Sequence, residues 1–296
     1  QADDRIATAA DLVATFFKRQ TEKPEFIQFG ITKLDKRVYA ERGDFIVIAG
    51  RPSAGKTALS IQMASSMASR HRVGYFSLET SQEKVADRWI ANQCMVNFGD
   101  IKRRSLTPQD MECIVSRKKD LMALQVEYIK ASGMTVDDIL HVALMRRFDV
   151  IFVDYLQLVH ARGKDRFEQV TNVSVGLHSL SQSHGITVIA LSQLSRNGSG
   201  QKPKLTDLRE SGQIEQDADD VLFLYLENED DEKSDRILCV AKNKEGGLGE
   251  IQLVFDGAKQ LFIEYMDEPK KFVNLPRYKR ARQEQENDVQ QTMKNA

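Results

Sequence analysis

Short runs of consecutive apolar residues recur along the first two thirds of the chain, separated by stretches with helical spacing. A continuous apolar run is typical of a strand that is buried on both faces of a parallel sheet. These runs predict strands at 45–49, 73–78, 150–154 and 186–191, and a further short strand is expected at 126–130. The stretches between them predict helices at 56–69, 80–95, 107–124, 135–148 and 167–183. This alternation predicts an α/β fold with a mostly parallel central sheet.

Helix start signals support three of these helices. Each begins with a threonine that is followed three residues later by an acid, which is the spacing of a capping box. The threonines are Thr80, Thr107 and Thr135. Pro108 adds a second start signal, because proline is favoured in the first turn of a helix.

The pattern changes after residue 195. Residues 196–204 are rich in Gly, Ser, Asn and Lys, and we expect a mobile loop there. Closely spaced strands are then predicted at 221–226, 236–241, 251–255 and 260–265. Tight turns at 246–247 and 256–257 are typical of antiparallel hairpins. The parallel core is therefore expected to continue into an antiparallel edge.

Both ends of the chain lie outside this regular pattern. Residues 4–20 predict a helix whose apolar members, including Phe16 and Phe17, need either their own domain or a neighbouring subunit to pack on. Residues 267–296 are charged and poorly periodic, so we expect a partly disordered tail. The chain is thus divided into a helix with its connector, an α/β domain and a tail, at 1–27, 28–266 and 267–296.

Composition narrows the classes of function. The net charge of −1 gives no bulk attraction to nucleic acid, so any such site must be local. The three cysteines and five histidines lack the spacing of a disulfide framework or a zinc site. No apolar run approaches the roughly 20 residues that span a bilayer. We expect a cytoplasmic protein with no membrane partner.

Residues 50–57 carry the strongest chemical signal. They read G-x-x-x-x-G-K-T between a predicted strand and a predicted helix, which is the pattern of a phosphate-binding P-loop. Backbone amides wrap the phosphates in such a loop, and the helix amino terminus favours negative charge. We expect Lys56 to reach the β- and γ-phosphates of ATP and Thr57 to ligate Mg²⁺. The expected nucleotide contacts are Gly50, Ser53, Ala54, Gly55, Lys56, Thr57 and Ala58.

Three polar residues follow strands that should end at the same sheet edge as the P-loop. Asp154 ends its strand and is suited to hold the Mg²⁺ shell. Glu79 is the better candidate for polarising the attacking water, although an acid there also suits the amino terminus of the next helix. Gln193 could sense the γ-phosphate, or could be an ordinary polar strand end.

Two later parts of the chain carry charge. Residues 196–204 and 206–213 could hold single-stranded nucleic acid through phosphate contacts, or could be solvated surface loops. They contain no aromatic residue, so base stacking would be minor. Lys242 and Lys244 point the same way on an extended segment. They could reach a phosphate, their own or a neighbour's, or could form a solvated strand end.

Five motifs in this order resemble one known family. They read GRPSAGKT at 50–57, SLETS at 77–81, VDYLQL at 153–158, ALSQLSR at 190–196 and DLRESGQIEQDAD at 207–219. Residues 28–265 resemble the DnaB-type replicative helicases, and the short, divergent linkers suggest a phage or mobile-element version. The resemblance implies a hexameric ring of RecA-like domains that moves 5′ to 3′ on single-stranded DNA, in a bacterial or phage-infected bacterial cell.

The resemblance also implies roles for individual side chains. It supports the P-loop, Glu79 and Asp154 in the roles given above, and it makes Gln193 the γ-phosphate sensor. Arg88 falls where the family has an arginine near the nucleotide. The positions that meet the DNA backbone in the central channel are Arg209, Glu210 and Gly212. The pair that reaches the neighbouring subunit's ATP is Lys242 and Lys244.

The chain departs from the family pattern in two places. The family usually has arginine where this chain has Lys244, and lysine cannot make the planar bidentate contact of a guanidinium. The family's N-terminal helical domain, which meets primase, is expected to be missing, because the chain starts at what resembles the linker helix. A helicase loader and primase are the further partners implied. That linker helix packs on the adjacent subunit, with Phe16 and Phe17 as the expected anchors.

Other functions share the same core. A RecA-like recombinase or a KaiC-like signalling ATPase also has this P-loop core, but such proteins form filaments or act on protein. Residues 207–219 favour the helicases. A domain that only binds nucleotide is the third alternative, and the joint presence of Lys56, Glu79 and Asp154 argues against it.

Overall fold

One mixed sheet organises the molecule. The computed structural model describes residues 7–194, 202–208, 212–265 and 272–273. In these ranges it has ten strands, which are Phe45–Gly50 (β1), Val73–Ser77 (β2), Val126–Lys130 (β3), Val150–Asp154 (β4), Thr187–Gln193 (β5), Asp220–Leu226 (β6), Arg236–Asn243 (β7), Gly249–Asp256 (β8), Leu261–Tyr265 (β9) and Phe272–Val273 (β10).

The strand order is β10-β9-β8-β7-β6-β1-β5-β4-β2-β3. The six strands from β6 to β3 in this order pair in parallel, and β7 to β10 continue from β6 as antiparallel neighbours. The predicted parallel core with an antiparallel edge is therefore confirmed. The β10 strand falls within the predicted tail, so the sheet extends further along the chain than the sequence pattern indicated.

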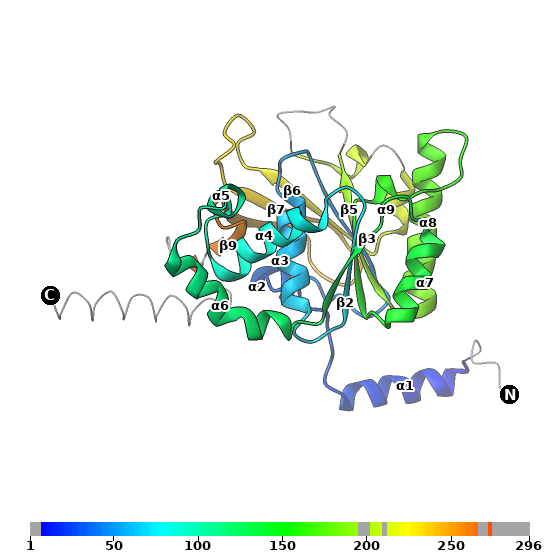
Figure 1. Cartoon of the computed structure of the whole chain (residues 1–296). Coiled ribbons are helices and arrows are strands. Elements are labelled where there is room, and N and C mark those ends of the chain that lie inside the picture. The colour runs from blue at the N-terminus through cyan, green and yellow to red at the C-terminus, as the bar shows by residue number, and fades with distance from the viewer. Residues whose placement is uncertain (1–6, 195–201, 209–211, 266–271, 274–296) are drawn as a thin grey trace.

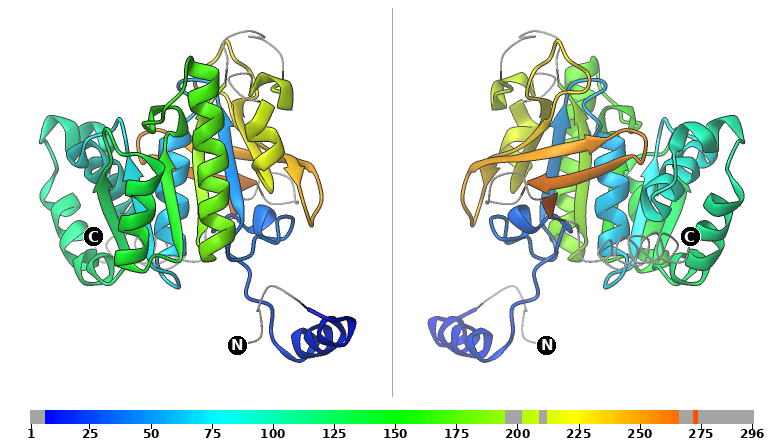
Figure 2. Two further views of the ribbon diagram at one scale, coloured as in Figure 1. Left: turned by 90° about the vertical axis from the view of Figure 1, so that its right-hand side faces the viewer. Right: turned by 90° about the vertical axis from the view of Figure 1, so that its left-hand side faces the viewer.

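Helices cover both faces of the sheet (Figures 1 and 2). Their bounds are Ala9–Thr21 (α1), Thr32–Asp35 (α2), Lys56–Met67 (α3), Gln82–Cys94 (α4), Phe98–Arg103 (α5), Pro108–Met122 (α6), Val136–Arg146 (α7), Arg166–His184 (α8) and Gly212–Asp217 (α9). Two 3-10 turns lie at Leu156–Leu158 and Leu205–Asp207. In the part of the chain that is described, no helix is both long and apolar enough to cross a membrane.

The two faces of the sheet carry separate apolar cores. Alternate residues of a strand point to opposite faces, and β1 divides its side chains in this way. Ile46 and Ile48 pack with α3 on one face, and Phe45 and Val47 pack with α7 and α8 on the other. All four side chains are fully buried. This two-sided burial explains why the sequence shows continuous apolar runs instead of alternation.

Two of the three predicted capping boxes are confirmed. The hydroxyls of Thr107 and Thr135 each accept from the amide three residues later, both at 3.2 Å. The third was wrong, because α4 begins at Gln82 and its N-cap is Ser81. The carbonyl of Thr80 instead accepts hydrogen bonds from Ser77 Oγ and from the Tyr128 hydroxyl, both at 2.7 Å. This tertiary contact keeps Thr80 out of the helix.

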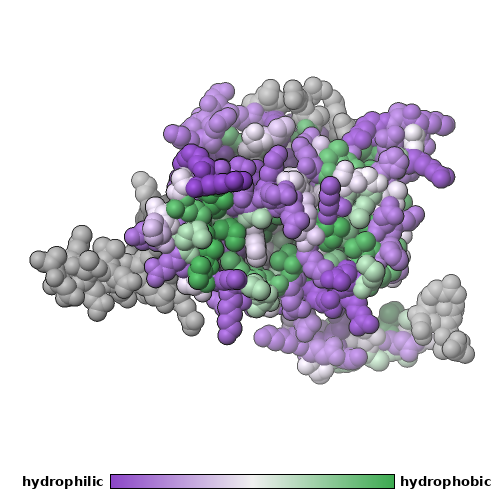
Figure 3. Space-filling view, viewed as in Figure 1, coloured by the Kyte–Doolittle hydropathy of each residue, from purple (hydrophilic) through white to green (hydrophobic). Residues whose placement is uncertain are grey.

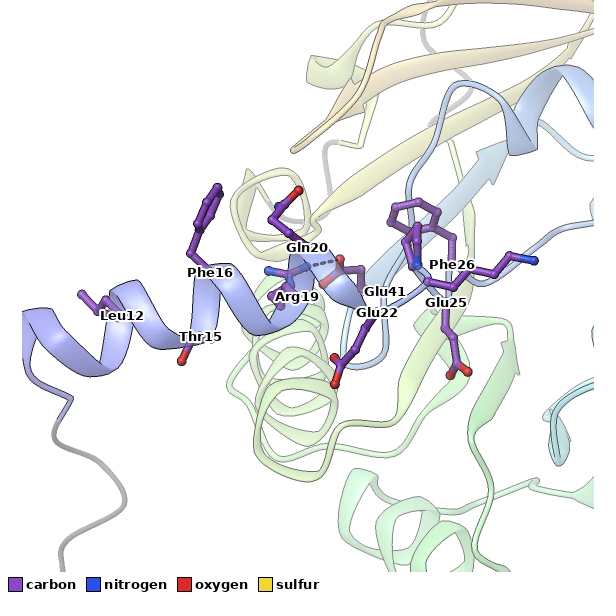
Figure 4. A pocket seen from close by; sticks show the side chains of 11 residues that line it. Leu12, Thr15, Phe16, Arg19, Gln20, Glu22, Glu25, Phe26 and Glu41 are labelled. Atoms are coloured by element: carbon purple, nitrogen blue, oxygen red, sulfur yellow. Dashed lines mark hydrogen bonds and ion pairs between the residues drawn. The ribbon is translucent and has the colours of Figure 1, made fainter.

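The first helix stands away from the body of the molecule on an extended connector (Figures 1 and 2). It begins at Ala9, later than predicted, and none of its residues is buried. The side chains of Phe16 and Phe17 are 57% and 64% exposed. Its last turn touches the body through Arg19, which donates to Glu41 at 2.8 Å (Figure 4). Packing of this helix on its own domain, the first of the two alternatives, is therefore not observed.

Apolar surface also gathers on the face that carries α3 and α4 (Figure 3). A hollow there is lined by Ile61 and Ala64 from α3, Val85 and Trp89 from α4, and Val126 from β3. The indole of Trp89 donates to Ser65 Oγ at 2.9 Å and so ties α4 to α3.

Candidate nucleotide site

The loop between β1 and α3 has the backbone that phosphate binding requires. Gly55 is the N-cap of α3 and has a left-handed φ of +103°. A Cβ at Gly50 would lie 2.4 Å from the carbonyl oxygen of Leu224, and one at Gly55 would lie 2.8 Å from Phe262 Cζ. Both positions therefore need glycine. The loop leads directly into the amino terminus of α3, whose unpaired amides form an anion site.

The remaining loop residues that the sequence predicted lie in the same turn. Ser53 has a φ of +64° and is exposed. Ala54 is fully buried and Ala58 is 2% exposed, so these two contribute packing beneath the loop. Their backbones remain part of the predicted phosphate cradle.

Lys56 lies against the loop that precedes it. Its Nζ donates to the carbonyl oxygens of Gly50 at 2.6 Å and Arg51 at 3.1 Å. Burial lowers the pKa of Lys56 to about 8, and the carboxylates of Asp154 and Glu79 oppose that shift. A buried ammonium gains stability from a nearby anion. Lys56 is thus prepared for a phosphate.

Asp154 closes the site from β4 and is 5% exposed. Burial raises its pKa, while hydrogen bonds from Tyr75 and Thr57 and the charge of Lys56 oppose the rise. The Tyr75 hydroxyl donates to Asp154 Oδ2 at 2.9 Å. A carboxylate beside a threonine hydroxyl suits Mg²⁺, which prefers oxygen ligands and completes its shell with phosphates and water. In the described ranges no group of three or more His, Cys, Asp or Glu is placed to hold a metal ion, so a cage made of protein alone is not present there.

Glu79 lies at the same edge, just beyond β2. Ser77 pairs in register with Asp154, and the amide of Leu78 donates to the Asp154 carbonyl at 2.8 Å. Glu79 itself is exposed. Its negative charge acts on the pKa of both Lys56 and Asp154. The fold therefore brings together two carboxylates and one lysine that are far apart in the sequence.

Gln193 pairs directly with Gly50 across the β1–β5 ladder, so it lies beside the start of the P-loop. Its backbone is held by Gln157, which belongs to the motif VDYLQL and had no predicted role of its own. Gln157 is 5% exposed. Its Nε2 donates to Ser192 Oγ at 2.8 Å and to the Gln193 carbonyl at 3.2 Å, and its Oε1 accepts from the Gln193 amide at 3.2 Å. The sequence signal that could have identified this role is a glutamine three positions after Asp154, the acid that ends β4.

Arg88 lies on α4 beside the turn before β9. Its Nη1 donates to Gln260 Oε1 at 2.7 Å, and its guanidinium lies 5.6 Å from the centre of the Phe98 ring. Asn92, one turn further on, donates to the Gln260 carbonyl at 2.8 Å. These contacts place Arg88 where α4 and α5 meet the antiparallel edge. Its predicted contact with nucleotide stays a prediction.

Lys242 and Lys244 lie at the opposite end of the sheet from the P-loop. Asn243, between them, pairs with Asp220, and Asp220 pairs with Ile46 at the start of β1. The P-loop follows the other end of β1, roughly 15 to 20 Å away at about 3.3 Å per strand residue. Of the three alternatives, a phosphate in their own site is therefore out of reach. A neighbour's phosphate and a solvated strand end both remain.

The predicted DNA-contacting positions are described only in part. Arg209 and Glu210 lie outside the described residues, as does most of the loop predicted at 196–204. Gly212 begins α9, and a Cβ there would meet nothing within 4 Å. Packing therefore does not require glycine at this position.

Comparison with known proteins identifies the arrangement. The family model described as DnaB-like helicase C terminal domain matches residues 27–264. The replicative DNA helicase DnaB of Geobacillus stearothermophilus is 34% identical over 270 residues, which cover 85% of this chain and 57% of that protein. The probable plasmid replicative DNA helicase of Chlamydia trachomatis is 35% identical over 254 residues, covering 82% and 56%. The chain thus spans a little over half the length of these relatives.

Two solved structures share the fold. One is described as an ATPase domain, and it superposes with a TM-score of 0.81 at 29% identity, covering 88% of this chain and 99% of that one. A DnaB-like replicative helicase, described with its interactions with primase, superposes with a TM-score of 0.79 at 29% identity, covering 89% and 68%. These matches confirm the predicted RecA-like class, with a mostly parallel sheet and antiparallel C-terminal edge strands.

Proposed function

The chain belongs to the DnaB-like helicase C-terminal domain family, and we propose from this premise that it is the ATP-hydrolysing motor of a replicative DNA helicase. The observation that carries the proposal is the meeting of Lys56, Asp154 and Glu79 at one sheet edge. A recombinase or signalling ATPase would share the P-loop. The match over residues 27–264 favours the helicases over both.

The P-loop would hold the triphosphate of ATP. Backbone amides at the start of α3 would face the phosphates. Lys56 would exchange the carbonyl oxygens of Gly50 and Arg51 for phosphate oxygens, which favours its charged form. Thr57 and Asp154 would hold Mg²⁺, which would neutralise negative charge that develops on the phosphates.

Glu79 would orient and polarise the attacking water. Asp154 is buried and receives hydrogen bonds from Tyr75 and Thr57, so its carboxylate lies beside the threonine that would hold the metal ion with it. Glu79 lies further out on the same edge and is exposed, where water reaches it. Gln193, beside Gly50, would respond to loss of the γ-phosphate through the backbone that Gln157 holds.

Assembly would complete each site. Lys242 and Lys244 lie at the ends of the strands opposite to their own P-loop, which supports a contact with a neighbouring subunit's ATP. The exposed apolar side chains of α1, including Phe16 and Phe17, support packing on that neighbour. We infer a hexameric ring that moves 5′ to 3′ on single-stranded DNA and unwinds duplex DNA. Arg209, Glu210 and Gly212 would meet the DNA backbone in its channel.

The same proposal extends to partners and location. One structural relative is described with its interactions with primase, and we propose a helicase loader and primase as partners of the whole protein. We further propose that it acts in the cytoplasm of a bacterial or phage-infected bacterial cell. ATP and Mg²⁺ are the proposed cofactors.

The test is the ATPase rate with and without single-stranded DNA, measured together with the assembly state. We expect single-stranded DNA to stimulate hydrolysis, and Lys56→Ala to abolish it. Unwinding of a forked duplex in the presence of ATP would separate a helicase from a recombinase or signalling ATPase. An assembled ring that hydrolyses ATP but neither responds to DNA nor unwinds a fork would contradict the helicase proposal.

A matched pair of variants tests the role of Glu79. Glu79→Gln removes the proposed base and should lower kcat at least about a hundredfold while nucleotide binding is kept. Glu83 is the acid in the first turn of α4, and its carboxylate accepts a hydrogen bond from Ser81. Glu83→Gln therefore removes an acid close to Glu79 in the sequence whose charge does not act on the pKa of Lys56 or Asp154. We expect Glu83→Gln to retain activity. Full activity in Glu79→Gln would overturn the assigned base role.

A further inference from the structure

The ammonium group of Lys242 is held by the end of α9. Its Nζ donates to three backbone carbonyl oxygens, those of Glu215 at 2.7 Å, Gln216 at 3.3 Å and Ala218 at 2.6 Å. The last carbonyls of a helix have no partner within the helix, so a cation there satisfies them. An ammonium has three N–H donors. Lys242 therefore has all its donors engaged while it is bound to α9.

Lys244 is held differently. Its Nζ pairs with Asp219 Oδ1 at 2.7 Å, and its side chain is 55% exposed. Asp219 is itself fixed, because its Oδ2 accepts from the amide of Phe45 at 2.9 Å. One contact uses one of three donors. Lys244 can therefore meet a phosphate without leaving Asp219, whereas Lys242 can do so only by releasing α9.

The helix that Lys242 holds begins at a position proposed to contact DNA. Its first residue is Gly212, next to the positions 209–211. On its inner side, Asp217 accepts from Ser174 of α8 at 2.7 Å, and Ile214 is 1% exposed. Asp217 is the last residue of α9, and the Lys242 contacts hold the backbone of this same carboxyl end. The carboxyl end of α9 thus has two side-chain anchors, Ser174 and Lys242, and a neighbour's phosphate would attract the second.

We propose that Lys242 exchanges between the carbonyl oxygens that end α9 and a nucleotide phosphate of the neighbouring subunit. The two states exclude each other, because both need the same donors. Nucleotide at the interface would then loosen α9, whose first residue, Gly212, is one of the proposed DNA contacts. By linkage, DNA that favours one position of α9 would change nucleotide affinity by the same factor. This inference rests on the proposed function and adds a positioning role to it.

The test compares single-stranded DNA affinity with and without a non-hydrolysable ATP analogue, in the assembled protein. The ratio of the two affinities measures the coupling, typically about 5- to 150-fold when such coupling exists. Lys242→Gln should bring this ratio to within about twofold of one. Lys244→Gln should weaken nucleotide binding while the ratio persists. Lys119 is an exposed residue of α6, so Lys119→Gln is the matched control and should retain the wild-type ratio.

Two results would overturn the inference. One is a wild-type ratio retained in Lys242→Gln, and the other is equal loss of the ratio in the Lys242 and Lys244 variants. A wild-type protein that neither hydrolyses ATP nor binds DNA would instead contradict the proposed function. If Lys242→Gln fails to assemble, amide hydrogen exchange of the wild-type protein tests the inference instead. Amides of 212–218 should exchange faster when the analogue is bound, and unchanged protection would refute the exchange.

Discussion

Gly55→Ala should destabilise the chain through two separate terms. A φ of +103° is unfavourable for alanine by roughly 1 to 2 kcal/mol. The new Cβ would also lie 2.8 Å from Cζ of Phe262, a side chain that is only 2% exposed and is packed against the Phe255 ring. Crowding of this kind in a packed core costs about 1 to 3 kcal/mol. We expect a total loss of about 2 to 5 kcal/mol.

Gly133→Ala provides a control that isolates the backbone term. Gly133 has a φ of +82°, and a Cβ there would meet nothing within 4 Å. This variant should lose only about 1 to 2 kcal/mol. Both free energies of unfolding can be measured by urea titration followed by circular dichroism. Combining Gly55→Ala with Phe262→Leu should cost less than the sum of the two single changes, by about 0.5 to 3 kcal/mol.

The same change should impair the nucleotide site. The ring of Phe262 and the loop must move apart, which shifts the amides that face the phosphates. We expect the Kd for ATP to rise at least about tenfold, while Gly133→Ala leaves it unchanged. Equal destabilisation of the two variants, to within about 0.5 kcal/mol, would show that Phe262 gives way without cost and would refute the crowding argument.

Three further predictions concern buried polar groups. Burial lowers the pKa of Lys56 from the ordinary 10.5 to about 8. Between these two values the folded chain binds fewer protons than the unfolded chain, so the free energy of unfolding rises with pH across that window. Lys56→Met should stabilise the apo protein at pH 7 by about 1 to 3 kcal/mol in urea unfolding and flatten this rise. Burial, with the charge of Asp44, raises the pKa of Asp220 to about 7, so stability falls as pH rises from about 4 to 7. Asp220→Asn should remove this fall, and a persisting fall would contradict it. Tyr75→Phe deletes the hydrogen bond to Asp154 and should lower the free energy of unfolding by about 1 to 2 kcal/mol. It should also move the acid limb of the ATPase pH profile to higher pH, because this bond lowers the pKa of Asp154. An unshifted limb would show that Tyr75 does not tune the pKa of Asp154.

Local signals in the sequence predicted most of the elements, because they act over a few residues. The capping boxes at Thr107 and Thr135 involve side chains and amides within one turn, and both helices begin there. The strand 150–154 was predicted with the bounds observed, because residues buried on both faces form a continuous apolar run. The bounds of 126–130 also match, although this strand is only partly buried and contains Glu127 and Lys130. The P-loop was recognisable because its function depends on local backbone geometry.

One expected helix start was wrong and two alternatives stayed open, in each case where contacts between distant parts of the chain decide. Thr80 has a capping spacing, but its carbonyl is taken by Ser77 and Tyr128, and the helix starts later. The sequence left α1 with two possible packing surfaces, and the structure removes one of them. It also left open which phosphate Lys242 and Lys244 could reach, and the strand register removes their own.

The sequence by itself determined the strands, most helices and the loop chemistry of this protein, because these depend on burial patterns, caps and glycines that are close along the chain. Only the tertiary structure decided which side chains share the site. Strand order puts Gln193 beside Gly50 and Asp154 beside Ser77, although the members of each pair are far apart in the sequence. It also gives Gln157 and Lys242 their backbone partners. Such contacts have no periodicity along the chain, because they form only when the sheet assembles.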